Sequence, residues 1–220
     1  MDEYYQKNEA EQNSTQDVRV TNEYYNRIMV VEYIALFFSS TGIGLSIIMN
    51  EIKLLETLST DNENIFLCYI TACSFSLVLT LYYRYDLHLK WYVTRGLLTE
   101  YDNLFSTGWW KMMVIEQFIA LLAPYPFLQN IRYVEYNPNY FVTISYDLNQ
   151  IMLCLCFIRI YIHLRYTLIV SKFMNPRSSR VCVMNGCEAD NTFAIKAIMK
   201  QRPYIFITFT LSVTIFLFGY

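Results

Sequence analysis

The chain has 220 residues, of which 55% are hydrophobic and only 16% are charged, and its formal net charge is −2 at pH 7. This near-balance of charge argues against a nucleic-acid-binding protein. The apolar residues occur in long blocks instead of short periodic groups, which is typical of a membrane protein. The six cysteines lack the spacing and the histidine neighbours of a zinc site, and they form no disulfide framework.

The chain begins with a polar segment, residues 1–27, which is rich in Glu, Gln, Asn and Tyr. It lacks the cationic start and short apolar core of a cleaved signal peptide, so we expect a flexible cytoplasmic tail. Long apolar runs then predict spans at residues 28–49, 65–83, 112–122 and 148–170, and the start of a fifth at residues 204–218.

Three further features of the sequence carry predictions. Small residues from Ser39 to Gly44 predict a face of the first span on which another helix packs closely. Basic and aromatic residues at the end of the second span mark the membrane interface, and we expect that helix to continue beyond the bilayer. Residues 125–146, rich in Tyr and Asn, are predicted to be a polar loop.

Lysine and arginine are distributed unevenly among the connections. Thirteen of them lie in the tail and in the connections 84–111 and 172–202, whereas the two alternate connections hold only Lys53 and Arg132. This positive-inside distribution predicts a multi-pass membrane protein with a cytoplasmic N-terminus.

Apart from Glu32 near the start of the first span, three charged residues lie within the predicted spans: Glu116 in the third, and Arg159 and Arg165 in the fourth. Placing an arginine at the centre of a membrane helix costs roughly 2.5–3.5 kcal/mol on insertion scales, so such groups usually face the protein interior. We expect Glu116 to pair with Arg159 or Arg165. A wet cavity, a protonated Glu116, or arginines that only snorkel to the interface are the alternatives.

Cations in the fourth span and an acid in the third predict the fold class, an all-α membrane protein with a voltage-sensor-like four-helix transmembrane bundle. The bundle comprises residues 28–171, a cytoplasmic amphipathic linker follows at residues 172–203, and residues 204–220 start a pore-domain helix. Two arginines crossing the whole field supply at most ~4.6 kcal/mol per 100 mV, and steep gating needs about three to four charges per subunit. We therefore predict weak voltage dependence.

The linker contains a basic amphipathic segment. Asn191 and Thr192 can cap a helix, and Lys196 and Lys200 follow one turn apart. The apolar face of that helix comprises Phe193, Ile195, Ala197, Ile198 and Met199. Such a segment is typical of a calmodulin target or of a helix on the membrane surface.

Several runs of this sequence are similar to one family of membrane proteins. They are residues 158–165 (IRIYIHLR), residues 178–180 (SSR), residues 191–199 (NTFAIKAIM), and Glu116 followed by Pro124 and Pro126. With these motifs the chain resembles the small-conductance calcium-activated potassium channels. The resemblance is firm over residues 111–220 and looser over residues 28–100.

The resemblance implies a tetrameric ion channel of identical or mixed subunits in the plasma membrane, with a pore loop between a fifth and a sixth span. Calcium acts through calmodulin, and no cofactor or metal is bound directly. The implied calmodulin contacts are Arg177, Ser178, Ser179, Arg180, Phe193, Ile195, Lys196, Ile198 and Met199. Membrane lipid is a further expected partner, nucleic acid is not, and potassium passes only through a complete channel.

The pore loop, its filter, the sixth span and the family's constitutive calmodulin-binding region have no counterpart in these 220 residues. We therefore expect either part of a channel or a pore-less interaction protein that modulates full-length subunits. An enzyme is not expected, since the only histidines, His88 and His163, are far apart in sequence. A proton-passing domain would need a denser arginine ladder and an acid deep in the first span, whereas Glu32 is near its edge.

Overall fold

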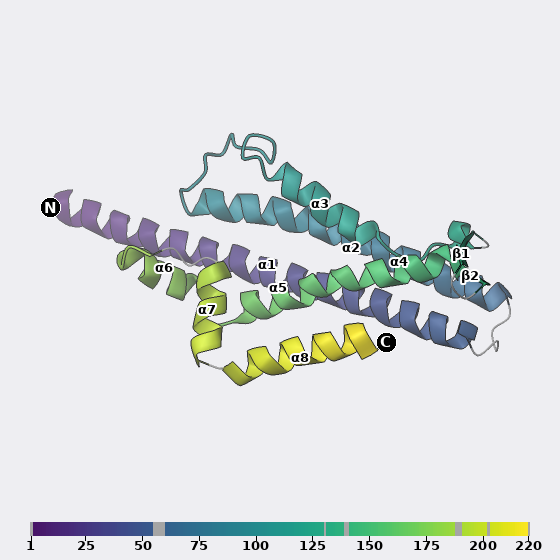
Figure 1. Ribbon diagram of the computed structural model, residues 1–220. Helices are drawn as coiled ribbons and strands as arrows, with labels where there is room; N and C mark the ends of the chain where they lie inside the picture. The colour runs from purple at the N-terminus through teal and green to yellow at the C-terminus, as the bar shows by residue number, and fades with distance from the viewer. Residues whose placement is uncertain are drawn as a thin grey trace. The chain divides into compact units, whose positions relative to one another are not determined.

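The computed structural model describes residues 2–54, 60–129, 131–138, 141–187, 191–201 and 203–219. The chain divides into two compact units, Met1–His163 and Leu164–Tyr220, each of which is described here by itself. Figure 1 shows that the chain is mostly helical.

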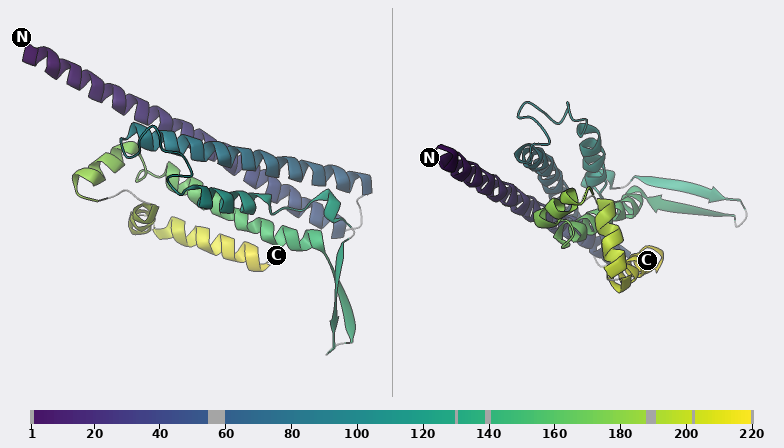
Figure 2. Two further views of the ribbon diagram at one scale, coloured as in Figure 1. Left: turned by 90° about the horizontal axis from the view of Figure 1, so that it is seen from above. Right: turned by 90° about the vertical axis from the view of Figure 1, so that its left-hand side faces the viewer.

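Two long helices, α1 (Asp2–Leu54) and α2 (Thr60–Thr94), lie side by side and form the frame of the first unit (Figures 1 and 2). In the part of the chain that the structure describes, three segments are long and apolar enough to cross a membrane. They are Val18–Lys53 within α1, Glu63–Thr94 within α2, and Leu148–Val170. The first, second and fourth predicted spans are thus confirmed as candidate membrane helices, and α2 continues past the predicted end of its span.

The other two predicted spans are helical but shorter. The third corresponds to α3 (Trp110–Leu121) and the fifth to α8 (Pro203–Gly219). At 1.5 Å per residue these helices are about 18 and 26 Å long, whereas the hydrocarbon core is about 30 Å thick. Neither is therefore confirmed as a complete span. Pro124 follows α3 closely and excludes its continuation as a regular helix.

The fourth span is made of three consecutive helical pieces. They are α4 (Leu148–Cys156), a 3-10 turn η2 (Phe157–Arg159) and α5 (Ile160–Val170). Asp147 precedes α4 and forms a capping box with Gln150, whose side chain accepts a hydrogen bond from the Asp147 backbone over 3.4 Å. The tighter turn places Arg159 in the interior of the bundle, where its side chain is fully buried.

Small apolar groups let the helices of the first unit approach one another. The central cluster joins α1, α2, α3 and α5 and comprises Ala35, Leu77, Leu81, Ala120 and Ile162. On the opposite faces large apolar side chains such as Phe37, Leu79 and Phe118 are exposed. An outward-facing apolar surface is what a helix in contact with lipid requires, since lipid supplies no hydrogen bonds.

The prediction of a flexible tail at residues 1–27 differs from the structure, in which α1 begins at Asp2. Nucleation is the unfavourable step in helix formation, and the spanning helix has already passed it. A preceding segment rich in the helix formers Glu, Gln and Lys can therefore extend that helix one residue at a time. Arg27 also pairs with Glu23 one turn earlier, at 2.7 Å. Tyr24 packs against the buried cluster of Ile28, Val31 and Leu87, so helix packing extends into the predicted tail.

The prediction of a polar loop at residues 125–146 is corrected as well, because this segment contains regular structure. It contains a short 3-10 helix, η1 (Pro126–Leu128), and an antiparallel hairpin of β1 (Arg132–Asn137) and β2 (Val142–Asp147). The hairpin projects from one end of the helices of the first unit (Figure 2). The missed signal is the alternation of apolar and polar residues from Val142 to Asp147, which is typical of a strand.

The second unit contains the rest of α5, followed by α6 (Pro176–Met184), α7 (Asn191–Gln201) and α8. Helix α7 begins at Asn191, so the predicted amphipathic helix of the linker is confirmed. The rings of Phe173 and Phe193 meet edge to face, with their centroids 6.5 Å apart.

An ion cluster joins four elements at the end of the first unit that carries the hairpin. Lys53 Nζ, at the end of α1, lies 3.2 Å from Glu63 Oε1 in α2 and 2.9 Å from Asp147 Oδ2. Arg132 Nε of β1 lies 3.3 Å from Asp147 Oδ1. The hydrogen bond from Lys53, aided by the charges of Lys53 and Arg132, holds the pKa of Asp147 below its ordinary value despite partial burial.

Because the folded-state pKa of Asp147 is depressed, its ionised form stabilises the fold above the ordinary aspartate pKa of about 3.9. That contribution is lost as the pH falls through the folded-state pKa. We expect Asp147→Asn to lower stability at pH 7 by less than about 1 kcal/mol, since Lys53 and Arg132 are partly exposed. Asn still caps α4, so the substitution isolates the charge.

The measurement is the thermal unfolding midpoint of the detergent-solubilised chain between pH 3 and pH 7. The parent chain should lose more stability on acidification than Asp147→Asn does. Glu135→Gln, an equal charge change at an exposed position on β1, is the control and should follow the parent. If the parent and Asp147→Asn lost equal stability on acidification, the charge of Asp147 would contribute nothing to the stability of the fold.

Candidate functional site

Three charged residues from three helices meet inside the first unit. Arg84 of α2 contacts Glu32 of α1 through Nε, and its Nη1 donates to Glu116 Oε2 of α3 over 3.1 Å. Glu32 is fully buried, and the side chains of Arg84 and Glu116 are only 12% and 20% exposed. Removing one partner of such a buried set leaves an uncompensated charge, which costs about 3–5 kcal/mol. We call these residues the Arg84 triad.

Arg159 forms a second buried polar centre. Its Nη2 donates to Ser74 Oγ of α2 over 3.0 Å and to the carbonyl of Ala120 of α3 over 2.6 Å. The Ser39 hydroxyl of α1 donates to the Arg159 carbonyl over 3.5 Å. The fourth span is thereby joined to the other three helices of the first unit by hydrogen bonds to uncharged groups.

The small-residue face of α1 makes room for this arginine. A Cβ atom added at Gly42 would lie 3.2 Å from Arg159 Nη1 and 3.9 Å from the Cys73 Cβ of α2. The prediction that the segment from Ser39 to Gly44 permits close packing is therefore confirmed. Any side chain at position 42 would press on the buried guanidinium.

Glu116 forms an ion pair with Arg84, which was not among its predicted partners, and its pairing with Arg165 stays a prediction. Arg84 takes the place expected for Arg159, whose hydrogen bonds go to Ser74 and Ala120. Arg165 belongs to the second compact unit, where it is half-buried. Glu32, which the sequence placed near the edge of the first span, is fully buried.

Arg84 and Glu32 were missed because each lies near the end of an apolar run. A signal was present, since the two residues lie at nearly equal chain distances on either side of the connection between α1 and α2. In an antiparallel pair of helices, residues so placed face one another at the same depth. An acidic and a basic residue at the same depth, such as Glu32 and Arg84, indicate an ion pair between the two helices.

The predicted calmodulin contacts lie on two short helices of the second unit. On α6, Arg177 and Arg180 are exposed, Ser178 is half-buried and Ser179 is buried. On α7, Lys196 and Met199 are exposed, whereas Phe193, Ile195 and Ile198 are half-buried. The basic side chains and one methionine of these two helices are thus exposed.

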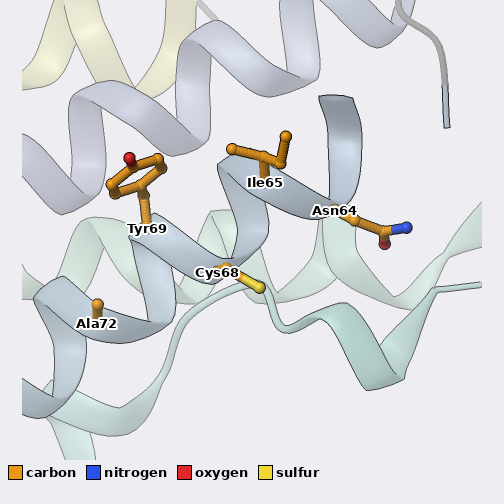
Figure 3. A pocket seen from close by; sticks show the side chains of 5 residues that line it. All are labelled: Asn64, Ile65, Cys68, Tyr69 and Ala72. Atoms are coloured by element: carbon orange, nitrogen blue, oxygen red, sulfur yellow. The ribbon is translucent and has the colours of Figure 1, made fainter. Parts of the chain in front are cut away.

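A shallow pocket lies on the outer face of α2 (Figure 3). It is lined by Asn64, Ile65, Cys68, Tyr69 and Ala72, which come from consecutive turns of one helix. Its surface is largely apolar, as expected on a lipid-facing helix.

His163 Nε2 lies 2.9 Å from the Ser40 hydroxyl in the first unit. Among the residues that the structure describes, no three His, Cys, Asp or Glu side chains are grouped so as to hold a metal ion.

Comparison with protein families finds no family model that matches the chain, and comparison with curated proteins finds no matching sequence.

The Arg84 triad predicts coupling between substitutions on α1 and α2. Arg84→Gln should destabilise the chain strongly, because Glu32 and Glu116 then repel each other in a buried site. In Glu32→Gln/Arg84→Gln, the loss should fall short of the sum of the two single losses by about 0.5–3 kcal/mol. Unfolding of the purified chain in mixed micelles measures each value.

The matched control is the same Arg→Gln change at Arg159. Arg159 hydrogen-bonds to Ser74 and Ala120 and not to the triad, so Glu32→Gln and Arg159→Gln should be additive. Equal coupling of Glu32 to both arginines, or to neither, would contradict the triad.

Proposed function

We propose that this chain is a subunit, or part of a subunit, of a calcium-activated potassium channel that calcium controls through calmodulin. The observation that carries the proposal is the linker after the fourth candidate span. It contains two short helices, α6 and α7, on which Arg177, Arg180, Lys196 and Met199 are exposed. Their positions agree with the motifs on which the resemblance to this channel family rests.

The physical basis is differential binding. A calcium-loaded calmodulin lobe exposes a methionine-rich apolar groove, and an amphipathic helix fills such a groove. Helix α7 offers Phe193, Ile198 and Met199 for this contact, with Lys196 and Lys200 beside them to attract the acidic lobe. If the linker is accessible in only one state of the gate, the binding free energy shifts the gate toward that state.

In this proposal α1, α2, α3 and the fourth span form a voltage-sensor-like bundle with a short third helix. Arg159 is held by hydrogen bonds to Ser74 and Ala120 and acts as a structural cation, which supports weak voltage dependence. Helix α8 begins the pore domain. Conduction requires rings of backbone carbonyls, which a complete tetramer in the plasma membrane would supply.

The test is binding of calmodulin to the whole chain in lipid nanodiscs, with calcium and with a calcium chelator. We expect tighter binding in calcium. Met199→Ala should weaken binding by about fivefold or more, since truncating an anchor side chain costs more than about 1 kcal/mol. Lys196→Glu/Lys200→Glu should slow association, because the lobe is acidic.

The control is Arg19→Glu/Lys111→Glu, which makes the same change in net charge on the same predicted side of the membrane but outside the linker. It should leave binding unchanged. Equal binding with and without calcium, or equal loss in the two charge variants, would overturn the calmodulin proposal. The chain would then be better explained as a pore-less interaction protein, which co-purification with complete subunits can test.

A further inference from the structure

Helix α6 ends in a Schellman motif that contains two cysteines. Gly186 follows the helix in the left-handed region, with φ of 71°. The backbone N–H of Cys187 donates to the carbonyl of Cys182 over 2.9 Å. This bond joins the second residue past the C-cap, Asn185, to the third-last residue of the helix. This motif commonly brings the side chains of those two residues into contact.

The backbone geometry places the two cysteines within reach of a disulfide. Given the 2.9 Å hydrogen bond and standard bond lengths, the Cα atoms of Cys182 and Cys187 are at most about 7 Å apart. Disulfides usually have Cα separations of about 4.4–6.8 Å. Both residues are accessible, since Cys187 is exposed and Cys182 is partly exposed.

A second cysteine pair shows that sequence spacing alone does not create this arrangement. Cys68 and Cys73 have the same spacing but lie inside the continuous helix α2. Five residues of regular helix advance about 7.5 Å along the axis, which already exceeds the range of a disulfide. The reversal of the chain at Gly186 is therefore what distinguishes Cys182 and Cys187.

We propose that Cys182 and Cys187 form a site of reversible oxidation, at which a hydroperoxide converts the two thiols into an intramolecular disulfide. The exposed Cys187 thiolate attacks the peroxide, whose O–O bond breaks, and becomes a sulfenic acid as one molecule of water or alcohol leaves. The Cys182 thiol then attacks the sulfenic sulfur, and a water molecule leaves. Two electrons pass from the two thiols to the peroxide.

The environment of the linker makes this bond conditional. In the proposed topology, with a cytoplasmic N-terminus and four crossings before the linker, the linker lies in the reducing cytosol, where disulfides are usually transient and regulatory. The bond would covalently close the C-terminal end of α6, the helix that carries Arg177 and Arg180. This site stands on backbone geometry and does not depend on calmodulin binding.

The experiment oxidises the reduced full chain in nanodiscs with hydrogen peroxide, then blocks free thiols and digests with trypsin. Cys182 and Cys187 fall in one tryptic peptide, residues 181–196. After oxidation this peptide should carry no blocking group, and its mass should be two hydrogens below that of the dithiol form. After reduction it should react with two blocking groups. The peptide that contains Cys68 and Cys73 should remain dithiol and serves as the internal control of equal spacing.

Two substitutions of Gly186 separate geometry from accessibility. Gly186→Asn tolerates the left-handed conformation and should retain the disulfide. Gly186→Val disfavours it and should reduce the disulfide fraction about five- to thirtyfold in a fixed glutathione buffer, with both thiols still exposed. Equal disulfide in Gly186→Val and the parent would overturn the proposal. So would oxidation to sulfinic acid, to mixed disulfides, or between chains in place of the internal bond.

Discussion

The ion contacts of Arg84 are the constraint on which the packing of the first unit depends. A guanidinium among apolar helices has no water to bind, so its charge must be balanced by the protein. Glu32 of α1 and Glu116 of α3 supply that balance. Sliding or rotating any of the three helices would separate a buried charge from its partner. The triad therefore fixes the depth of three helices relative to one another.

Arg159 constrains the fourth span in a different way. Its hydrogen bonds reach Ser74 and the carbonyl of Ala120, and Gly42 leaves the space that the guanidinium needs. Ala120 lies one helical turn after Glu116 on α3. The two buried polar centres are therefore stacked along the bundle, one of them compensated by carboxylates and the other by neutral oxygens.

The second unit carries exposed basic side chains, an exposed methionine and two cysteines on the segment that follows the fourth span. Exposed basic side chains and Met199 on α6 and α7 are the features that favour calmodulin as a partner. The turn at Gly186 adds a thiol pair to the same segment. Binding would act through apolar and electrostatic contacts, whereas oxidation would act through a covalent bond. The two can therefore respond to different conditions.

The sequence by itself determined the features that arise from local composition. Apolar runs of sufficient length gave the candidate spans in α1, α2 and at Leu148–Val170, and the capping residue Asn191 with its amphipathic pattern gave α7. The hairpin had a local signal as well, an alternation that stands out less clearly than a long apolar run.

Only the tertiary structure decided which buried charges meet. Arg84 and not Arg159 reaches Glu116 as an ion pair, because pairing depends on the depth and rotation of helices that are remote in sequence. By contrast, Cys68/Cys73 and Cys182/Cys187 share one spacing and differ through a local feature. The reversal of the backbone at Gly186 gives the second pair a backbone geometry within reach of a disulfide. Hydropathy and capping depend on near neighbours in the chain, whereas ion pairs and disulfides depend on distances in space.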